Sequence, residues 1–158
     1  MPPTVVAMIL AYALGPGVPA GSLGLDEQCI MAHNVVRAAA GVPTLVWSDR
    51  LAAVAQEWAD RLILSGVLEH RPDSPYGENL LDVRGTSFTP GQAIAVWAAE
   101  ARDYDYSANA CRGTCGHYTQ LVWRGTTRVG CAVGRAGNRE VWVCEYDPPG
   151  NYLGERPY

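Results

Sequence analysis

Four side chains in the middle of the chain are the ones best suited to chemistry: His70, Glu78, Glu100 and His117. Imidazole nitrogens and carboxylate oxygens bind zinc and other divalent ions, and the same groups move protons in acid–base catalysis. If the fold brings them into one cleft, they can hold a metal ion or catalyse a reaction. They can equally satisfy one another in a polar network that ties loops to the core. Spacing along the chain leaves both interpretations open.

Glu100 is predicted to face inward from a helix. Thr89, Pro90 and Gln92 have the pattern of a helix start, in which the threonine caps and the glutamine bonds back to the cap. Glu100 lies three residues after Trp97 and therefore shares its apolar face. A carboxylate in that position must be paired, hydrated in a cleft or bound to a metal.

The sequence places no nucleophile beside these groups. His70 precedes a proline-rich loop, and Glu78 is expected in a glycine-led turn. The nearby serines, Ser74 and Ser107, lie in no activating motif. A hydrolase built here would depend on metal-bound water, whose pKa zinc lowers to about 7. Binding without catalysis is therefore the favoured interpretation.

The composition is that of one folded domain behind a leader. The chain has 158 residues, 48% of them apolar, and its net charge of −4 gives no electrostatic footprint for nucleic acid. Val5 to Leu14 form an apolar run of signal-peptide length, too short to span a bilayer, with a cleavage site near Ala20. We expect a leader over residues 1–24, a single domain over residues 25–158 and no transmembrane segment.

The domain contains signals for helices first and for strands later. A helix is predicted from Asp26 to Ala40, stopped by Gly41. A second runs from near Ser48 to about Ser65, with apolar residues every three or four positions. The helix that carries Glu100 is expected to end near Tyr104.

The end of the chain is predicted to be a β-hairpin. Residues 128–133 and 140–146 have strand character, and Gly137-Asn138 is a favoured two-residue turn. With that turn, Cys131 faces Cys144 at a non-hydrogen-bonded pair, where the strands lie closest. That separation suits a disulfide. The turn chemistry and the cysteines therefore require the same register.

Three further cysteines remain after this pairing. Cys111 and Cys115 are predicted to close a short local disulfide loop. Free buried thiols, or a zinc site at these two residues, are the alternatives. Cys29 is left as a free thiol or a partner for another chain.

Four segments carry a resemblance to a known family. Gly116–Thr126 and Val141–Tyr152 resemble the two signatures of the CAP superfamily, which comprises cysteine-rich secretory proteins, antigen 5 and plant pathogenesis-related proteins. His33–Arg37 and Gly77–Leu80 match two further family motifs in the expected order. The likeness extends from Asp26 to Tyr158 and includes plant and bacterial members.

The resemblance implies a fold and a cleft. The expected fold is an α-β-α sandwich with a three- or four-stranded antiparallel sheet between helical layers. The family cleft carries two histidines and two glutamates, which correspond to His70, Glu78, Glu100 and His117, and some members bind zinc or another divalent ion there. Other members bind sterols or fatty acids at separate sites, and the corresponding loop here lies near Tyr104 and Tyr106.

The function implied is that of a secreted, extracellular, monomeric defence module that binds a sterol, a fatty acid or another small apolar ligand and is not an enzyme. The alternatives are a metal-dependent hydrolase or peptidase, and a precursor of a signalling peptide released from Pro148–Tyr158. Trp142 and Glu145 depart from the second signature. Plant relatives commonly have six cysteines, and the two absent here would fall near Gly66 and Ala136.

Overall fold

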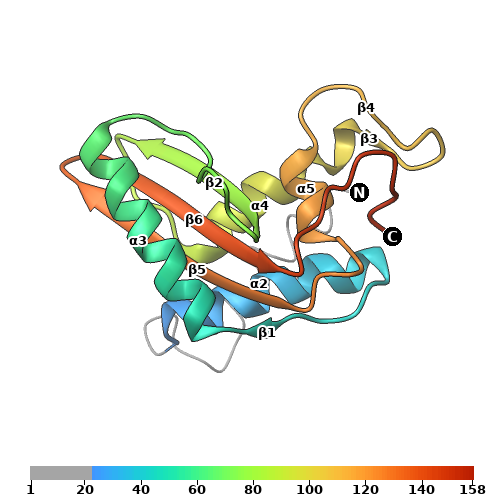
Figure 1. Ribbon diagram of the computed structural model, residues 1–158, viewed down its shortest axis with the longest axis horizontal. Coiled ribbons are helices and arrows are strands. Elements are labelled where there is room, and N and C mark those ends of the chain that lie inside the picture. The colour runs from blue at the N-terminus through green and yellow to red at the C-terminus, as the bar shows by residue number, and fades with distance from the viewer. Residues whose placement is uncertain (1–22) are drawn as a thin grey trace.

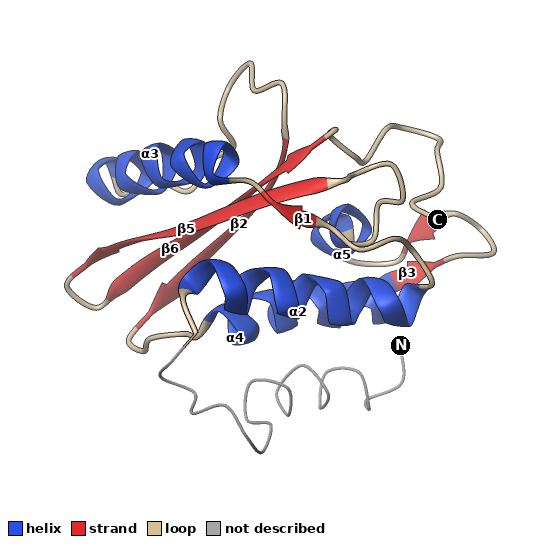
Figure 2. Cartoon of the chain, turned by 90° about the horizontal axis from the view of Figure 1, so that it is seen from below, coloured by secondary structure: helices blue, strands red, loops and turns tan. Residues whose placement is uncertain are grey.

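The computed structural model describes residues 23–158, so the predicted leader lies outside the described residues except for its last two positions. The described chain forms three layers (Figures 1 and 2). Helix α3 covers one face of a central sheet, and helices α2 and α4 cover the other. This is the α-β-α sandwich that the family resemblance implies.

The first three helices begin where the sequence signals place them. Ser48 caps α3 by accepting the backbone N–H of Leu51, and Thr89 and Gln92 form the predicted capping box of α4. The third helix differs from expectation because its α-helical part stops at Ala99 and one 3-10 turn completes it. The helical elements are α2 (Leu25–Ala40), α3 (Asp49–Ser65), α4 (Pro90–Ala99), η1 (Glu100–Asp103) and α5 (Gly116–Leu121).

The main sheet has four strands in the order β1-β5-β6-β2. Its strands are β1 (Val46–Trp47), β2 (Gly77–Arg84), β5 (Arg128–Ala136) and β6 (Arg139–Asp147). The three long strands are antiparallel, as expected, whereas the two-residue β1 pairs in parallel with β5. β3 (Tyr104–Asp105) and β4 (Ala110–Cys111) form a separate small ribbon.

The position of Glu78 corrects one sequence expectation. The sequence predicts a glycine-led turn here, but the structure places Glu78 in β2, an edge strand of the sheet. The burial of β2 does not alternate regularly along its length, so it lacks the period-two pattern that marks a strand.

The β5–β6 hairpin has the predicted register, with Ala136 opposite Arg139 and Cys131 opposite Cys144. The predicted disulfides Cys131–Cys144 and Cys111–Cys115 are both present. Cys29 is a free thiol with no exposed surface, so it cannot reach a cysteine of another chain without unfolding.

Helix α3 lies unusually close to the sheet because two glycines of β5 face it. A Cβ atom on Gly130 would lie 2.1 Å from the backbone nitrogen of Ala52, and one on Gly134 would lie 2.8 Å from the carbonyl of Ala59. Any larger residue would push the helix away. Beside these contacts α3 buries Trp58 against the same face of the sheet.

Removing the hairpin disulfide is expected to destabilise the fold. The double variant Cys131→Ser/Cys144→Ser should lose about 3 kcal/mol, because the unfolded chain regains the freedom of a loop of this length. Urea unfolding followed by circular dichroism measures this. The matched variant Cys111→Ser/Cys115→Ser opens a shorter, exposed loop and should lose about 2 kcal/mol. Equal stability of the hairpin variant and the parent would contradict the prediction.

Candidate functional site

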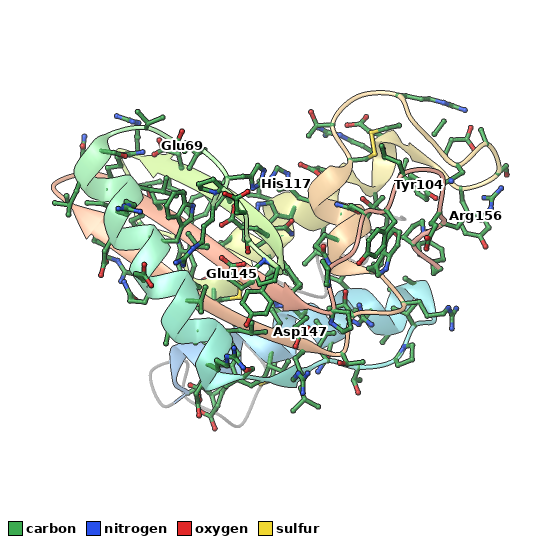
Figure 3. The ribbon with its side chains drawn as sticks, in the orientation of Figure 1. Glu69, Tyr104, His117, Glu145, Asp147 and Arg156 are labelled. Atoms are coloured by element: carbon green, nitrogen blue, oxygen red, sulfur yellow. A yellow bond between two sulfur atoms is a disulfide. The ribbon has the colours of Figure 1, made fainter. Side chains whose placement is uncertain are left out.

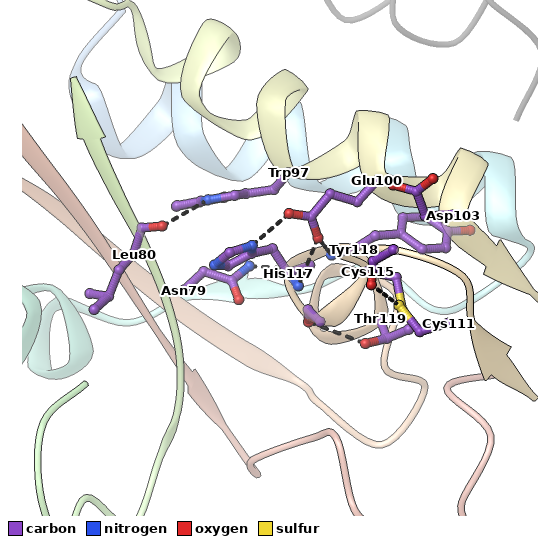
Figure 4. A network of polar contacts seen from close by, with 12 residues as sticks. Asn79, Leu80, Trp97, Glu100, Asp103, Cys111, Cys115, His117, Tyr118 and Thr119 are labelled. Carbon is purple, nitrogen blue, oxygen red and sulfur yellow. Dashed lines mark hydrogen bonds and ion pairs between the residues drawn. A yellow bond between two sulfur atoms is a disulfide. The ribbon is translucent and has the colours of Figure 1, made fainter. Parts of the chain in front are cut away.

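His117 is held at the start of α5 by the carboxylate of Glu100. Glu100 Oε1 lies 2.7 Å from Nδ1 of His117, and Oε2 accepts the backbone N–H groups of His117 at 3.0 Å and of Tyr118 at 3.2 Å. The Trp97 ring stacks on the imidazole, with 6.0 Å between the ring centroids (Figure 4). Both oxygens of this carboxylate are therefore occupied within the protein.

His70 forms a second pair of the same kind with Glu78. Nδ1 of His70 lies 2.5 Å from Oε1 of Glu78, which also accepts the backbone N–H of Arg71 at 3.2 Å. The hydrogen bond to Glu78 raises the pKa of His70 above its ordinary value, against the opposing effect of partial burial. The imidazole is largely exposed, whereas the side chain of Glu78 is almost fully buried.

Asn79 connects the two pairs. It follows Glu78 in β2, so the two side chains point to opposite faces of the strand. Its amide donates to the backbone carbonyl of His117 at 3.1 Å and to the Tyr146 hydroxyl at 3.2 Å. The start of β2 thus positions Glu78, which lies in the strand, and it also positions α5, because Asn79 donates a hydrogen bond to the backbone of His117.

The structure forms two histidine–carboxylate pairs rather than one cluster of four ligand atoms. Among residues 23–158, the one group of three or more potential ligand atoms within 4.8 Å of one another is His33, Cys131 and Cys144. In each predicted pair the Nδ1 atom faces a carboxylate, and no hydrogen bond to Nε2 of His70 or His117 is found in the described part of the chain.

The group of His33, Cys131 and Cys144 has its potential ligand atoms close enough together to hold a metal ion. These atoms are instead used in a disulfide and in hydrogen bonds that stabilise the fold. The two sulfurs are joined in a disulfide and supply no thiolate. His33 Nδ1 lies 2.8 Å from the carbonyl of Cys29, and Nε2 lies 2.9 Å from the Tyr146 hydroxyl. Burial lowers the pKa of His33 to about 4, so the ring is neutral. The group ties α2 to β6.

Glu145 is a buried carboxyl group beside the His70–Glu78 pair that the sequence analysis does not single out as a site residue. It faces Glu78 directly across the β2–β6 pair and has no exposed surface, and neither of its carboxylate oxygens has a hydrogen-bond partner among the described residues. Burial, and then the charge of Glu78, raise the pKa of Glu145 to about 8. At neutral pH the Glu145 carboxyl group is therefore mostly protonated. The only sequence signal was its departure from the family signature.

Tyr104 and Tyr106, the predicted ligand-contacting residues, lie beside a depression of about 210 Å³. Two arginines and one aspartate complete the lining, so the depression is polar at its edges. Its volume is below the roughly 300–1,000 Å³ of typical small-molecule pockets. The depression is lined by Arg102, Tyr104, Asp105, Tyr106 and Arg112.

The layered fold is an α-β-α sandwich in which two histidine–glutamate pairs lie beside the start of β2. A family model described as the cysteine-rich secretory protein family, CAP, matches residues 30–146. The chain belongs to this family, and the resemblance seen in its four motifs is confirmed.

Plant pathogenesis-related proteins are among its similar relatives. The chain is 43% identical over 141 residues to pathogenesis-related protein PR-1 of Medicago truncatula, covering 87% of this chain and 81% of the relative. It is 46% identical over 136 residues to pathogenesis-related protein 1A of Nicotiana tabacum, covering 84% and 80%. The structure of Schistosoma mansoni venom allergen-like protein 4 matches with a TM-score of 0.73 at 25% identity, covering 86% of this chain and 94% of that one.

Proposed function

We propose that this protein is a secreted, defence-related binding module that captures a sterol, a fatty acid or another small apolar ligand and holds a divalent cation in its histidine–glutamate cleft. Two disulfides support secretion, because such bonds persist in oxidising compartments. None of the described helices has the length and hydropathy needed to cross a bilayer. The plant relatives support the defence role.

One observation carries the cation site. Each cleft histidine directs Nδ1 at a carboxylate and leaves Nε2 without a protein partner among the described residues. Metal-binding histidines characteristically donate their other ring N–H to a carboxylate, which fixes the tautomer and the ring orientation. His70 and His117 would therefore be the ligands, through Nε2, and Glu78 and Glu100 would orient them.

The small number of protein ligands, two imidazoles, argues for binding rather than hydrolysis. Catalytic zinc sites usually have three protein ligands and one open position. Here both oxygens of Glu100 are already bonded to α5 and to His117, and Oε1 of Glu78 is bonded to His70 and to the backbone N–H of Arg71. We therefore assign the two imidazoles, and neither carboxylate, as the protein ligands. A bound zinc ion would act as a Lewis acid on whatever fills its other positions. One protein of this fold, NaASP2, has been solved with Zn²⁺, at a TM-score of 0.72 and 23% identity.

Zinc titration tests the cation site. His70→Ala and His117→Ala should each weaken Zn²⁺ binding at least tenfold in isothermal titration calorimetry, because each removes one of two ligands. Glu100→Gln should weaken it about 10- to 100-fold, because the amide no longer fixes the imidazole as the carboxylate does. Glu69→Gln is the matched control, since Glu69 is an exposed neighbour of His70, and it should bind Zn²⁺ as the parent does.

Two results would overturn this account of the cleft. Unchanged Zn²⁺ affinity in both histidine variants would remove the cation site. Peptide hydrolysis by the parent that disappears in the histidine variants would establish the metal-dependent hydrolase in place of the binding module. Mass spectrometry of the protein purified from a secreting host identifies any lipid that it carries.

A further inference from the structure

The C-terminal residue of the chain lies inside a cluster of tyrosines that belongs to the predicted ligand-binding loop. The Tyr158 ring stacks on Tyr106, with 4.9 Å between centroids and 16° between planes, and meets the edge of Tyr104 at 6.4 Å. Its hydroxyl lies 3.1 Å from the hydroxyl of Tyr118. Tyr104, Tyr106 and Tyr118 thus form a slot, here called the tyrosine slot, that holds one phenol ring.

Specific contacts hold the last residues of the chain at this slot. Arg156 donates to the backbone carbonyls of Tyr106 and Ser107, and its guanidinium lies 5.1 Å from the centroid of the Tyr106 ring. The carbonyl of buried Pro157 accepts the backbone N–H of Arg124 at 2.7 Å. Tyr104 and Arg156 accordingly lie near each other beside the β3–β4 ribbon (Figure 3).

The chain that leads into the slot is attached much less firmly. Between Asn151 and Arg156, residues 152–155 are all exposed, and Leu153 is fully so. Asn109 makes only long hydrogen bonds to the carbonyls of Gly154, at 3.4 Å, and Glu155, at 3.2 Å. Exposed backbone with few buried apolar contacts opens at low free-energy cost. The end of the chain can therefore leave while the sandwich stays folded.

We propose that Tyr158 occupies a binding site for a flat ring that carries a hydroxyl group, and that such a ligand enters the tyrosine slot only when the C-terminal tail is displaced. The inference rests on the proposed binding of a small apolar ligand near Tyr104 and Tyr106. It adds the chemical class of that ligand, and it identifies Tyr158 as the group that competes with the ligand. Tyr158 itself defines that class, because it supplies an apolar ring between two tyrosines and a hydroxyl to Tyr118. Phenols and sterols both present this chemistry.

The competition has a direct physical basis. A tethered side chain reaches the slot at an effective concentration in the millimolar range, so it outcompetes a free ring of equal intrinsic affinity. Loss of the tail, by cleavage or by mutation, removes that competitor without altering the slot. Binding of a hydroxylated ring should then become about tenfold tighter or more.

The test compares two tyrosines of the same tail. Binding of 4-methylphenol, which copies the tyrosine side chain, is followed by NMR titration, and binding of cholesterol by equilibrium dialysis. Tyr158→Ala should bind 4-methylphenol at least about tenfold more tightly than the parent. Tyr152→Ala is the control, because Tyr152 lies against Trp123 and outside the slot, and it should bind as the parent does. A synthetic peptide of residues 149–158 should displace the phenol from Tyr158→Ala.

The inference is overturned if Tyr158→Ala binds the phenol no more tightly than Tyr152→Ala does. If Tyr158→Ala does not fold, Tyr158→Phe replaces it, because that variant loses only the hydroxyl contact to Tyr118 and should bind the phenol more tightly than the parent. If Tyr106→Ala abolishes cholesterol binding but Tyr158→Ala does not increase binding of either probe, the proposed function stands and this inference fails. If Tyr158→Ala gains phenol binding while no variant binds cholesterol, the inference stands and the sterol fails.

Discussion

Replacing Arg37 with methionine is expected to lower the free energy of unfolding by about 4 kcal/mol or more. This is the range found when a buried charged group is removed and its hydrogen-bond partners are left unpaired. Arg37 has no exposed surface and donates through Nε and both terminal nitrogens to four backbone carbonyls. The acceptors and distances are Pro43 (2.6 Å), Leu121 (2.9 Å), Trp123 (2.9 Å) and Thr126 (3.2 Å). Methionine has similar length but no donors, so these buried acceptors would be left unpaired.

The effect should extend to the cleft, because the carbonyls of Leu121 and Trp123 lie at the end of α5, the helix that begins beside His117. Burial lowers the pKa of Arg37 to about 10, so the guanidinium remains charged at neutral pH. Urea unfolding of Arg37→Met measures the loss, with Arg102→Met, at a side chain that is 79% exposed, as the matched control. Less than about 1 kcal/mol of destabilisation, the usual scale of a surface change, would contradict the account.

Glu145→Gln is expected to stabilise the protein at alkaline pH. Because the pKa of Glu145 is raised from 4.5 to about 8, the folded protein binds more protons than the unfolded chain between these values. The contribution of this group to stability is complete below about pH 4.5 and is lost as the pH rises through about 8. The loss amounts to several kcal/mol, because one pKa unit corresponds to about 1.4 kcal/mol. Glutamine stays neutral and can donate to Glu78 at every pH.

The measurement is urea unfolding of parent and variant from pH 5 to pH 9. The difference in stability between the two should be small at pH 5 and grow in favour of Glu145→Gln up to pH 9. Glu140→Gln is the matched comparison on the same strand, because Arg135, the backbone N–H of Phe88 and Trp142 lower the pKa of Glu140 to about 2 despite its burial. That variant should be less stable than the parent at neutral pH. A constant Glu145→Gln difference across the range would refute the raised pKa of Glu145.

Local signals in the sequence predict much of this fold. The caps at Ser48 and Thr89 act within one helical turn, and the Gly137-Asn138 turn fixes the register that joins Cys131 to Cys144. Each of these depends on residues that are close in the chain, or on a hairpin whose two strands share one short turn. The sequence alone is therefore sufficient to predict these caps and this register.

The parts that sequence reasoning missed depend on contacts between distant segments. The pairing of Glu78 with Glu145 needs the register of β2 against β6, which no turn links. Arg37 has the position of one more polar residue in an amphipathic helix, and its four acceptors lie in loops and at the end of α5, up to 89 residues away. The two histidine–glutamate pairs were predicted as a group through the family motifs, but their division into ligands and orienting carboxylates required the hydrogen-bond geometry.

Anomalous diffraction from crystals soaked in Zn²⁺ tests the central claim about the cleft most directly. The account predicts a zinc peak about 2.0–2.1 Å from Nε2 of both His70 and His117, with Glu78 and Glu100 still bonded to Nδ1 of these histidines. Zinc bound to the Glu78 and Glu145 carboxylates with neither imidazole as a ligand would contradict it.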